Sequence, residues 1–134
     1  QLAFPPITMR IGRRPAFALY HLGALITVPI AYLFASSYWQ AVALLTLMTF
    51  FTAGMHSGYA IYFPEMFPTR LRATGASFCF NVGRLLSAVM LLVRGYLRNW
   101  LDLRLAVSVM ALLFLVGLVL LLFAPETKDK ELPE

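Results

Sequence analysis

Four long apolar segments limit the fold of this chain more than any other feature of its sequence. They cover residues 16–35, 41–63, 74–96 and 105–124. A helix needs roughly 20 apolar residues to cross a bilayer, so each segment is long enough for one crossing. The remaining sequence is too short for a separate soluble domain. We therefore predict an all-α fold, with a single membrane region of four transmembrane helices over residues 1–134 and a tail at residues 125–134.

Composition excludes several other classes of protein. Hydrophobic residues make up 60% of the chain and charged residues 13%, which is too apolar for a soluble fold of this size. The basic residues lie in short groups between the apolar segments, whereas a nucleic-acid binder gathers them on one face. The single cysteine, Cys79, excludes an internal disulfide and a multi-cysteine metal site. The sequence contains no catalytic constellation, so we predict no enzyme activity, cofactor or metal.

The charges between the segments predict an orientation. Seven basic residues lie on the side of the two termini: Arg10, Arg13, Arg14, Arg70, Arg72, Lys128 and Lys130. Three lie on the opposite side: Arg94, Arg98 and Arg104. Loops on the cytoplasmic side carry the excess of Lys and Arg. We therefore expect both termini and the 125–134 tail in the cytoplasm, with the bilayer being the inner or plasma membrane of the cell.

The second apolar segment has a polar face. At 100° per residue, its polar side chains fall within about an 80° arc. They are Thr49, Thr52, His56 and Tyr59. Gly54 and Gly58 lie on nearly the opposite side, a spacing that suits close helix packing. The polar arc either faces a polar cavity or is satisfied locally, with the hydroxyls bonding to their own helix and His56 to a neighbouring one.

The third segment carries Asn81 and, near its centre, Arg84. A guanidinium in hydrocarbon costs about 2.5–3.5 kcal/mol on insertion scales, so it should face protein or water and have a partner. No acidic residue lies within any of the four segments. We therefore expect the partner to be a helix C-terminus, a bound anion, or an acid in a part of the protein beyond this sequence. A structural or gating role and an anion contact both remain open.

Two prolines follow the second segment, and we expect Pro64 and Pro68 to end its helix because proline lacks an N–H and clashes with the preceding turn. Glu65 lies between them. Its carboxylate could pair with arginines of the same or neighbouring loops, namely Arg13, Arg14, Arg70 and Arg72. The simpler interpretation is a set of solvated charges that reflect only topology, since exposed pairs contribute about 0–1 kcal/mol.

Motifs in the loops resemble those of one known family. They are RIGRRP at 10–15, YFPEMFPTR at 62–70, RATG at 72–75, NVGR at 81–84, and PETK at 125–128 followed by ELPE at 131–134. In this order around four segments, they resemble the C-terminal third of a major facilitator superfamily transporter, in the branch of sugar porters and metabolite–proton symporters. That family usually carries an Asp close before the first arginine of the RIGRRP loop. Here Thr8 and Met9 occupy that stretch.

The resemblance implies a twelve-helix carrier of two six-helix halves, in which these segments are helices nine to twelve. Such a carrier moves a small organic solute, such as a sugar or an organic acid, by alternating access with proton coupling. Its partners are the lipid bilayer, the solute, protons and the remaining helices. The resemblance implies a cytoplasmic latch formed by Arg13, Arg14, Glu65, Arg70, Arg72 and Glu126. It also implies a substrate cavity with Thr49, Thr52, His56, Tyr59, Asn81 and Arg84 as candidate lining residues.

Two alternatives come from other classes. Four helices alone cannot form a cavity between two halves, so the chain could be a truncated, non-transporting membrane fragment or an accessory protein. A complete four-helix multidrug transporter would need a glutamate within its first span. Residues 16–35 contain no acid, which excludes that class.

Overall fold

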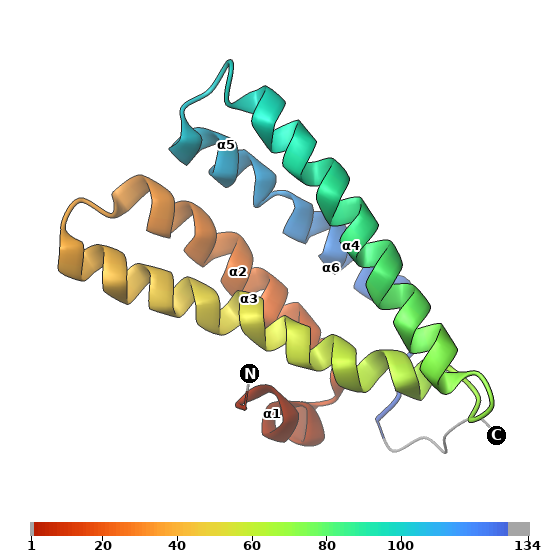
Figure 1. Ribbon diagram of the computed structural model, residues 1–134. Coiled ribbons are helices and arrows are strands. Elements are labelled where there is room, and N and C mark those ends of the chain that lie inside the picture. Colours follow the sequence, from red (N-terminus) through yellow and green to blue (C-terminus); the bar gives the residue numbers. More distant parts are fainter. Residues whose placement is uncertain (1, 129–134) are drawn as a thin grey trace.

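The computed structural model describes residues 2–128, and this part of the chain contains helices and loops without any β-strand. Figure 1 shows the helices in order. They are α1 (Phe4–Ile11), α2 (Arg13–Phe34), α3 (Tyr38–Met66), α4 (Arg72–Leu97), α5 (Leu103–Met110) and α6 (Leu113–Phe123). Helix α2 lies at the centre of the packing, because it contacts α1, α3, α5 and α6.

Four helical stretches are long and apolar enough to cross a membrane, namely α2, α3, α4, and α5 with α6. This confirms the predicted all-helical membrane bundle. Each stretch begins two or three residues before the predicted apolar segment, because a helix continues into flanking polar residues that hydropathy does not count. The division into one membrane region and a tail stays a prediction. Lys130 and the ELPE motif lie outside the described residues.

Helix α3 ends later than expected. It continues through Pro64 to Met66, so the prediction that Pro64 ends the helix is wrong. A proline in the last turn removes only one backbone hydrogen bond. Pro68 has the stronger effect, because the residue before a proline is disfavoured in the helical region. Phe67 accordingly has φ −111° and ψ 144°, which is extended backbone.

The last apolar segment is divided into α5 and α6 by a turn at residues 111–112. Neither Gly nor Pro marks this turn in the sequence. Its amides bond three residues back: Leu112 N–H to the Val109 carbonyl and Leu115 N–H to the Leu112 carbonyl, both at 3.0 Å. This is the 3₁₀ pattern, which tightens the helix locally. The two pieces still form one membrane-length stretch.

An aromatic core joins α1, α2 and α3. The Phe4 ring lies 5.1 Å from the Phe17 ring and 4.9 Å from the Tyr20 ring, both edge-on, an arrangement that aromatic quadrupoles favour. The glycine face of α3 packs against these rings. A Cβ on Gly54 would collide with Tyr20, and one on Gly58 with Phe4. The small residues of α3 therefore allow α2 to approach closely.

Candidate functional site

The ends of α2, α3 and α6 meet in a group of charged side chains. Arg13 donates from Nη2 to Glu65 Oε1 at 2.7 Å and from Nε to Glu65 Oε2 at 3.2 Å. This two-point geometry is the strong form of an arginine–carboxylate pair. The hydroxyl of Thr127 also donates to Glu65, at 2.5 Å. Arg13 Nη1 donates to the Thr8 hydroxyl at 3.0 Å, so Thr8 supplies an acceptor in the stretch where the resembling family carries an acid.

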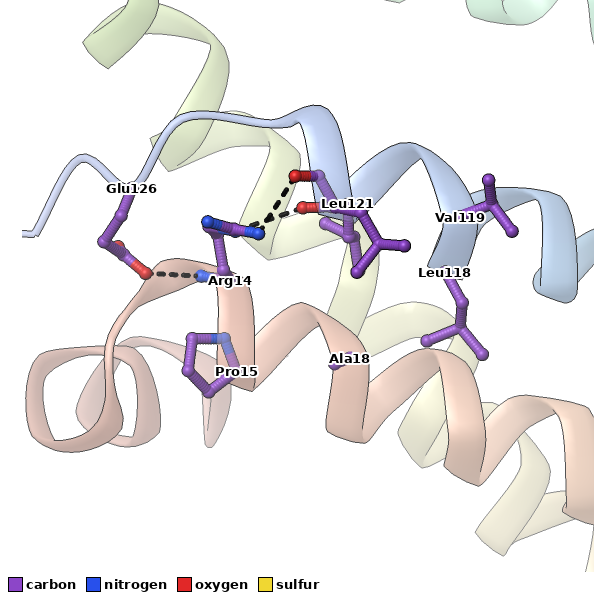
Figure 2. Close-up of a pocket in the computed structure, with 8 residues that line it drawn as sticks. Arg14, Pro15, Ala18, Leu118, Val119, Leu121 and Glu126 are labelled. Atoms are coloured by element: carbon purple, nitrogen blue, oxygen red, sulfur yellow. Dashed lines mark hydrogen bonds between the residues drawn. The ribbon is translucent and has the colours of Figure 1, made fainter.

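Glu126 and Arg14 cap each other's helices. Glu126 accepts the backbone N–H groups of Arg13 at 2.9 Å and Arg14 at 3.0 Å, in the first turn of α2. Arg14 donates its side-chain N–H groups to the carbonyls of Leu121 and Leu122, both at 3.1 Å, in the last turn of α6. Figure 2 shows the contacts of Arg14 with Glu126 and with the end of α6, beside a pocket of about 630 Å³. Helix ends leave such backbone groups without partners, so each of the two side chains stabilises the end of the other helix.

Gly12 allows Glu126 to reach α2. Its φ of 101° lies in the left-handed region that favours glycine. A Cβ at this position would also lie only 3.1 Å from Glu126 Oε2. Two further bonds hold the segment that carries Glu126: the Tyr62 hydroxyl donates to the Pro125 carbonyl at 2.6 Å, and Lys128 Nζ donates to the Arg10 carbonyl at 2.9 Å.

The environment of Glu126 changes its acidity. Burial alone would raise the pKa of its carboxyl group, but backbone N–H groups of Arg13, Arg14, Lys128 and Thr127 donate to the charged form. Their combined effect is larger, so the pKa of Glu126 lies below its ordinary value. The carboxylate therefore stays charged at neutral pH and keeps its bonds to α2.

The structure brings together four of the six predicted latch residues. We call Arg13, Arg14, Glu65 and Glu126 the charge cluster. Within residues 2–128, no hydrogen bond or ion pair is described from Arg70 or Arg72 to either glutamate of the cluster. Arg72 donates to the Thr69 hydroxyl at 3.3 Å. The chain turns at residues 69–71 before α4 begins, and both arginines follow Pro68. Thr8 and Thr127 belong to the same network, and as single hydroxyl residues they gave no signal in the sequence.

A second feature is a cavity of about 620 Å³ between α2, α3, α4, α5 and the start of α6. Its polar lining residues are Tyr32, Thr52, Ser87 and Arg94. Of the six predicted cavity residues, only Thr52 is among them. The Thr52 hydroxyl donates to the Met48 carbonyl of its own helix at 3.0 Å, and so makes the local bond that the sequence left open.

The other predicted cavity residues lie elsewhere. Tyr59 stacks on the rings of Phe17, at 5.0 Å, and Phe63, at 5.2 Å. Thr49, His56, Asn81 and Arg84 are exposed in the described structure. The Asn81 side chain donates to the Ser77 carbonyl at 2.9 Å. Within residues 2–128, no hydrogen bond or ion pair of the Arg84 side chain is described. These four side chains are therefore exposed and do not line the cavity.

The family model of the Major Facilitator Superfamily matches residues 1–134. The chain belongs to the Major Facilitator Superfamily. This confirms the family that the loop motifs indicated, and it makes the protein an integral membrane protein of a family of transporters, not of enzymes. No solved structure matches the chain.

Three relatives show the level of similarity. The chain is 30% identical to a putative metabolite transport protein of Haemophilus influenzae, over 96% of this chain and 32% of the relative. It is 32% identical to a probable 4-methylmuconolactone transporter of Cupriavidus pinatubonensis, over 89% and 28%. It is 31% identical to a cis,cis-muconate transport protein of Acinetobacter baylyi, over 87% and 28%. The chain thus spans about a third of the length of the curated relatives it matches.

Proposed function

We propose that this chain forms part of a proton-coupled transporter that moves a small organic acid across the membrane by alternating access. Support for an acid comes from the relatives named for muconate and 4-methylmuconolactone transport. In this proposal the four membrane-length helices are the ninth to twelfth of a twelve-helix carrier. Both ends of the chain face the cytoplasm, and the bilayer is the inner or plasma membrane.

One observation carries the alternating-access part of the proposal: the charge cluster joins three separate motifs at one end of the bundle. Arg13 comes from the RIGRRP motif, Glu65 from the second motif, and Glu126 from PETK. Charged pairs that bridge helix ends favour one arrangement of those helices, and alternating access requires helices to change arrangement. The cluster therefore acts as a latch that must loosen when the cytoplasmic side opens.

The open face of α4 supplies the proposed contact with the acid. Arg84 lies in the middle of a membrane-length helix, where an uncompensated cation is costly. A carboxylate on the solute would neutralise it in a charge-assisted hydrogen bond. Asn81 and the exposed members of the α3 arc, Thr49 and His56, would complete this polar surface. An imidazole can accept and donate a proton through its ring nitrogens, so we assign the coupled proton to His56.

This function is tested by measuring uptake into proteoliposomes that contain the protein purified from its native host. Labelled cis,cis-muconate and a labelled sugar would be offered with and without an inward proton gradient. We expect gradient-stimulated uptake of the acid and a smaller response for the sugar. Uptake of the sugar alone would contradict the assignment to acids. Absence of any flux from protein shown to be inserted and helical would favour the non-transporting alternative.

Two variants with a matched control test the assigned side chains. We expect Arg84→Gln to lower acid uptake at least tenfold, because it removes the one arginine near the middle of a membrane-length helix within residues 2–128. His56→Asn should abolish the response to the proton gradient and preserve exchange of acid for acid. Arg104→Gln, which changes an exposed arginine outside both surfaces, should behave like the wild type. Wild-type uptake by Arg84→Gln would remove Arg84 from the site.

A further inference from the structure

The cavity between α2, α3, α4, α5 and α6 is separate from the charge cluster. Arg84 is not among its lining residues, although Ser87 and Leu91 on the same side of α4 are. Its volume of about 620 Å³ lies within the usual range of small-molecule sites, roughly 300–1,000 Å³. Most of its lining is apolar, and three of the lining residues are methionines: Met48, Met90 and Met110. Methionine is unbranched and polarisable, so such a lining adapts to different apolar shapes. The body of a ligand here would be hydrocarbon.

The polar groups of this cavity gather toward one end. Arg94 lies in the last turn of α4, and Tyr32 lies in the last turn of α2. The hydroxyl of Ser87, further along the cavity, donates to the Gly83 carbonyl of its own helix at 2.8 Å. Ser87 is therefore already satisfied, as is Thr52. Within the described residues, the lining donors that make no described hydrogen bond are those of Arg94 and Tyr32.

Within residues 2–128, no hydrogen bond or ion pair of the Arg94 side chain is described. No acidic residue is among the residues that line the cavity. The positive-inside rule does not account for it either, since it falls on the side with fewer basic residues. A guanidinium presents N–H groups in a fixed fork that matches a carboxylate. The cavity thus combines an exposed arginine, which has no described ion pair, with a mostly apolar and partly exposed lining.

We propose that this cavity binds a hydrophobic monocarboxylate, whose carboxylate pairs with Arg94 and whose apolar body lies along α4 toward Leu86. The eight residue steps from Arg94 to Leu86 correspond to about 12 Å of helix, enough for a medium-length hydrocarbon chain. A dicarboxylate fits less well. Its second carboxylate would lie against apolar side chains such as Leu86 and Leu91, where no described lining residue offers a partner, so it would lose hydration without gaining a bond.

Such a ligand has two possible sources, namely the transported solute or a fatty acid of the surrounding membrane. Binding at Arg94 follows from the cavity alone. The view that the bound acid is also transported deepens the proposed function and rests on it. The two sources share the same chemistry, so the experiment needs separate measurements of binding and of exchange.

Binding of labelled decanoate to the purified protein in detergent tests the site, with unlabelled decanoate and decanedioate as competitors. These acids have the same number of carbons and differ by one carboxylate. We expect decanedioate to compete at least tenfold more weakly. Arg94→Gln should weaken decanoate binding about tenfold or more, because the charge-assisted bond is lost. Equal competition by the two acids, or wild-type binding by Arg94→Gln, would overturn the proposal.

Two further variants keep the result specific. Arg98→Gln removes an arginine one turn further along, outside the lining, and should bind decanoate as the wild type does. Ser87→Leu leaves Arg94 in place but takes up cavity volume, so it should also weaken binding. Equal losses in Arg94→Gln and Arg98→Gln would mean that net charge alone, and not this site, attracts the acid.

The source of the ligand is decided in proteoliposomes preloaded with labelled organic acid. External decanoate that accelerates release of the label identifies a transported solute, and fatty acid that copurifies with the wild type but not with Arg94→Gln identifies a membrane ligand. Decanoate binding through Arg94 without transport of any acid would leave the site standing and refute the proposed function. Acid transport without Arg94-dependent binding would refute the site and leave the proposed function standing.

Discussion

Helices α2 and α4 have similar hydropathy and opposite surroundings. The most apolar stretch of each has a mean hydropathy of 1.7. Nevertheless, α2 has eight buried residues and α4 has none. Lipid is as apolar as a leucine side chain, so hydropathy selects the membrane without selecting helix partners. In α2 the partners follow from shape, because aromatic rings such as Tyr20 fit against glycines of α3.

The polar residues of the two helices differ in the same way. His21 of α2 is 5% exposed, and its Nδ1 lies 2.8 Å from the Phe17 carbonyl oxygen. Gly117 leaves room for its ring, since a Cβ there would lie 2.5 Å from it. Arg84 of α4 is exposed. The polar group of α2 is thus satisfied by its neighbours, whereas Arg84 of α4 makes no described hydrogen bond or ion pair within residues 2–128.

The largest difference in stability between the surroundings of α2 and of α4 is expected from substitutions of single glycines. Gly54→Ala places a methyl group against the Tyr20 ring, and overpacking of this kind costs about 1–3 kcal/mol. Gly83→Ala on α4 has nothing within 4 Å of the new Cβ. It should be neutral or stabilise the helix by up to about 1 kcal/mol. Thermal unfolding in detergent, followed by circular dichroism, measures both. Equal losses in the two variants would mean that α4 is packed as tightly as α2.

A smaller effect is expected where α2 begins. Glu65→Gln removes the charge that pairs with Arg13 in a site where both side chains are less than a fifth exposed, 16% and 17%. We expect a loss of about 1 kcal/mol. Asp102→Asn is the matched control, because Asp102 precedes α5 without a side-chain cap bond. Equal unfolding temperatures for Glu65→Gln and Asp102→Asn would show that the charge cluster does not anchor α2.

The smallest effect is a pH dependence at the same end of α2. The pKa of Glu126 is lowered in the folded protein from its ordinary 4.5. Its stabilising contribution is therefore fully present above pH 4.5 and is lost as the pH falls through the lower, folded value. Between pH 6 and pH 3, the unfolding temperature of the wild type should fall more than that of Glu126→Gln. Parallel decreases would show that Glu126 does not cap α2.

Sequence patterns predicted the helices better than their ends. Four apolar segments gave four membrane-length stretches, because segment length against bilayer thickness is a local property. Pro64 was expected to end α3. The helix tolerates Pro64 because this residue lies in its last turn, and Pro68 determines the end instead. The turn at 111–112 had no marker in the sequence, since backbone tightening requires neither Gly nor Pro.

The candidate sites divide by how locally they are specified. The pairing of Arg13 with Glu65 could be anticipated, because each lies next to the end of a predicted helix and carries opposite charge. Arg70 was equally close in sequence but faces elsewhere after the turn at Pro68. The arc on α3 predicted Thr52 as a cavity residue, yet Arg94 and Ser87 reach the same cavity from α4. Their placement depends on how α4 lies relative to α2, and the periodicity of a single helix carries no information about that arrangement.

The sequence by itself determined the membrane setting, the four helical stretches, the family and the charged motifs at the helix ends. These depend on composition, local periodicity and short spacings along the chain. Tertiary structure decided that Glu126 and Arg14 cap opposite helices, that α2 is enclosed while α4 stays open, and that Arg94 lines a cavity. The physical reason is that residues far apart in sequence create these features only when helices approach, and in lipid that approach is governed by shape and polar pairing instead of hydropathy.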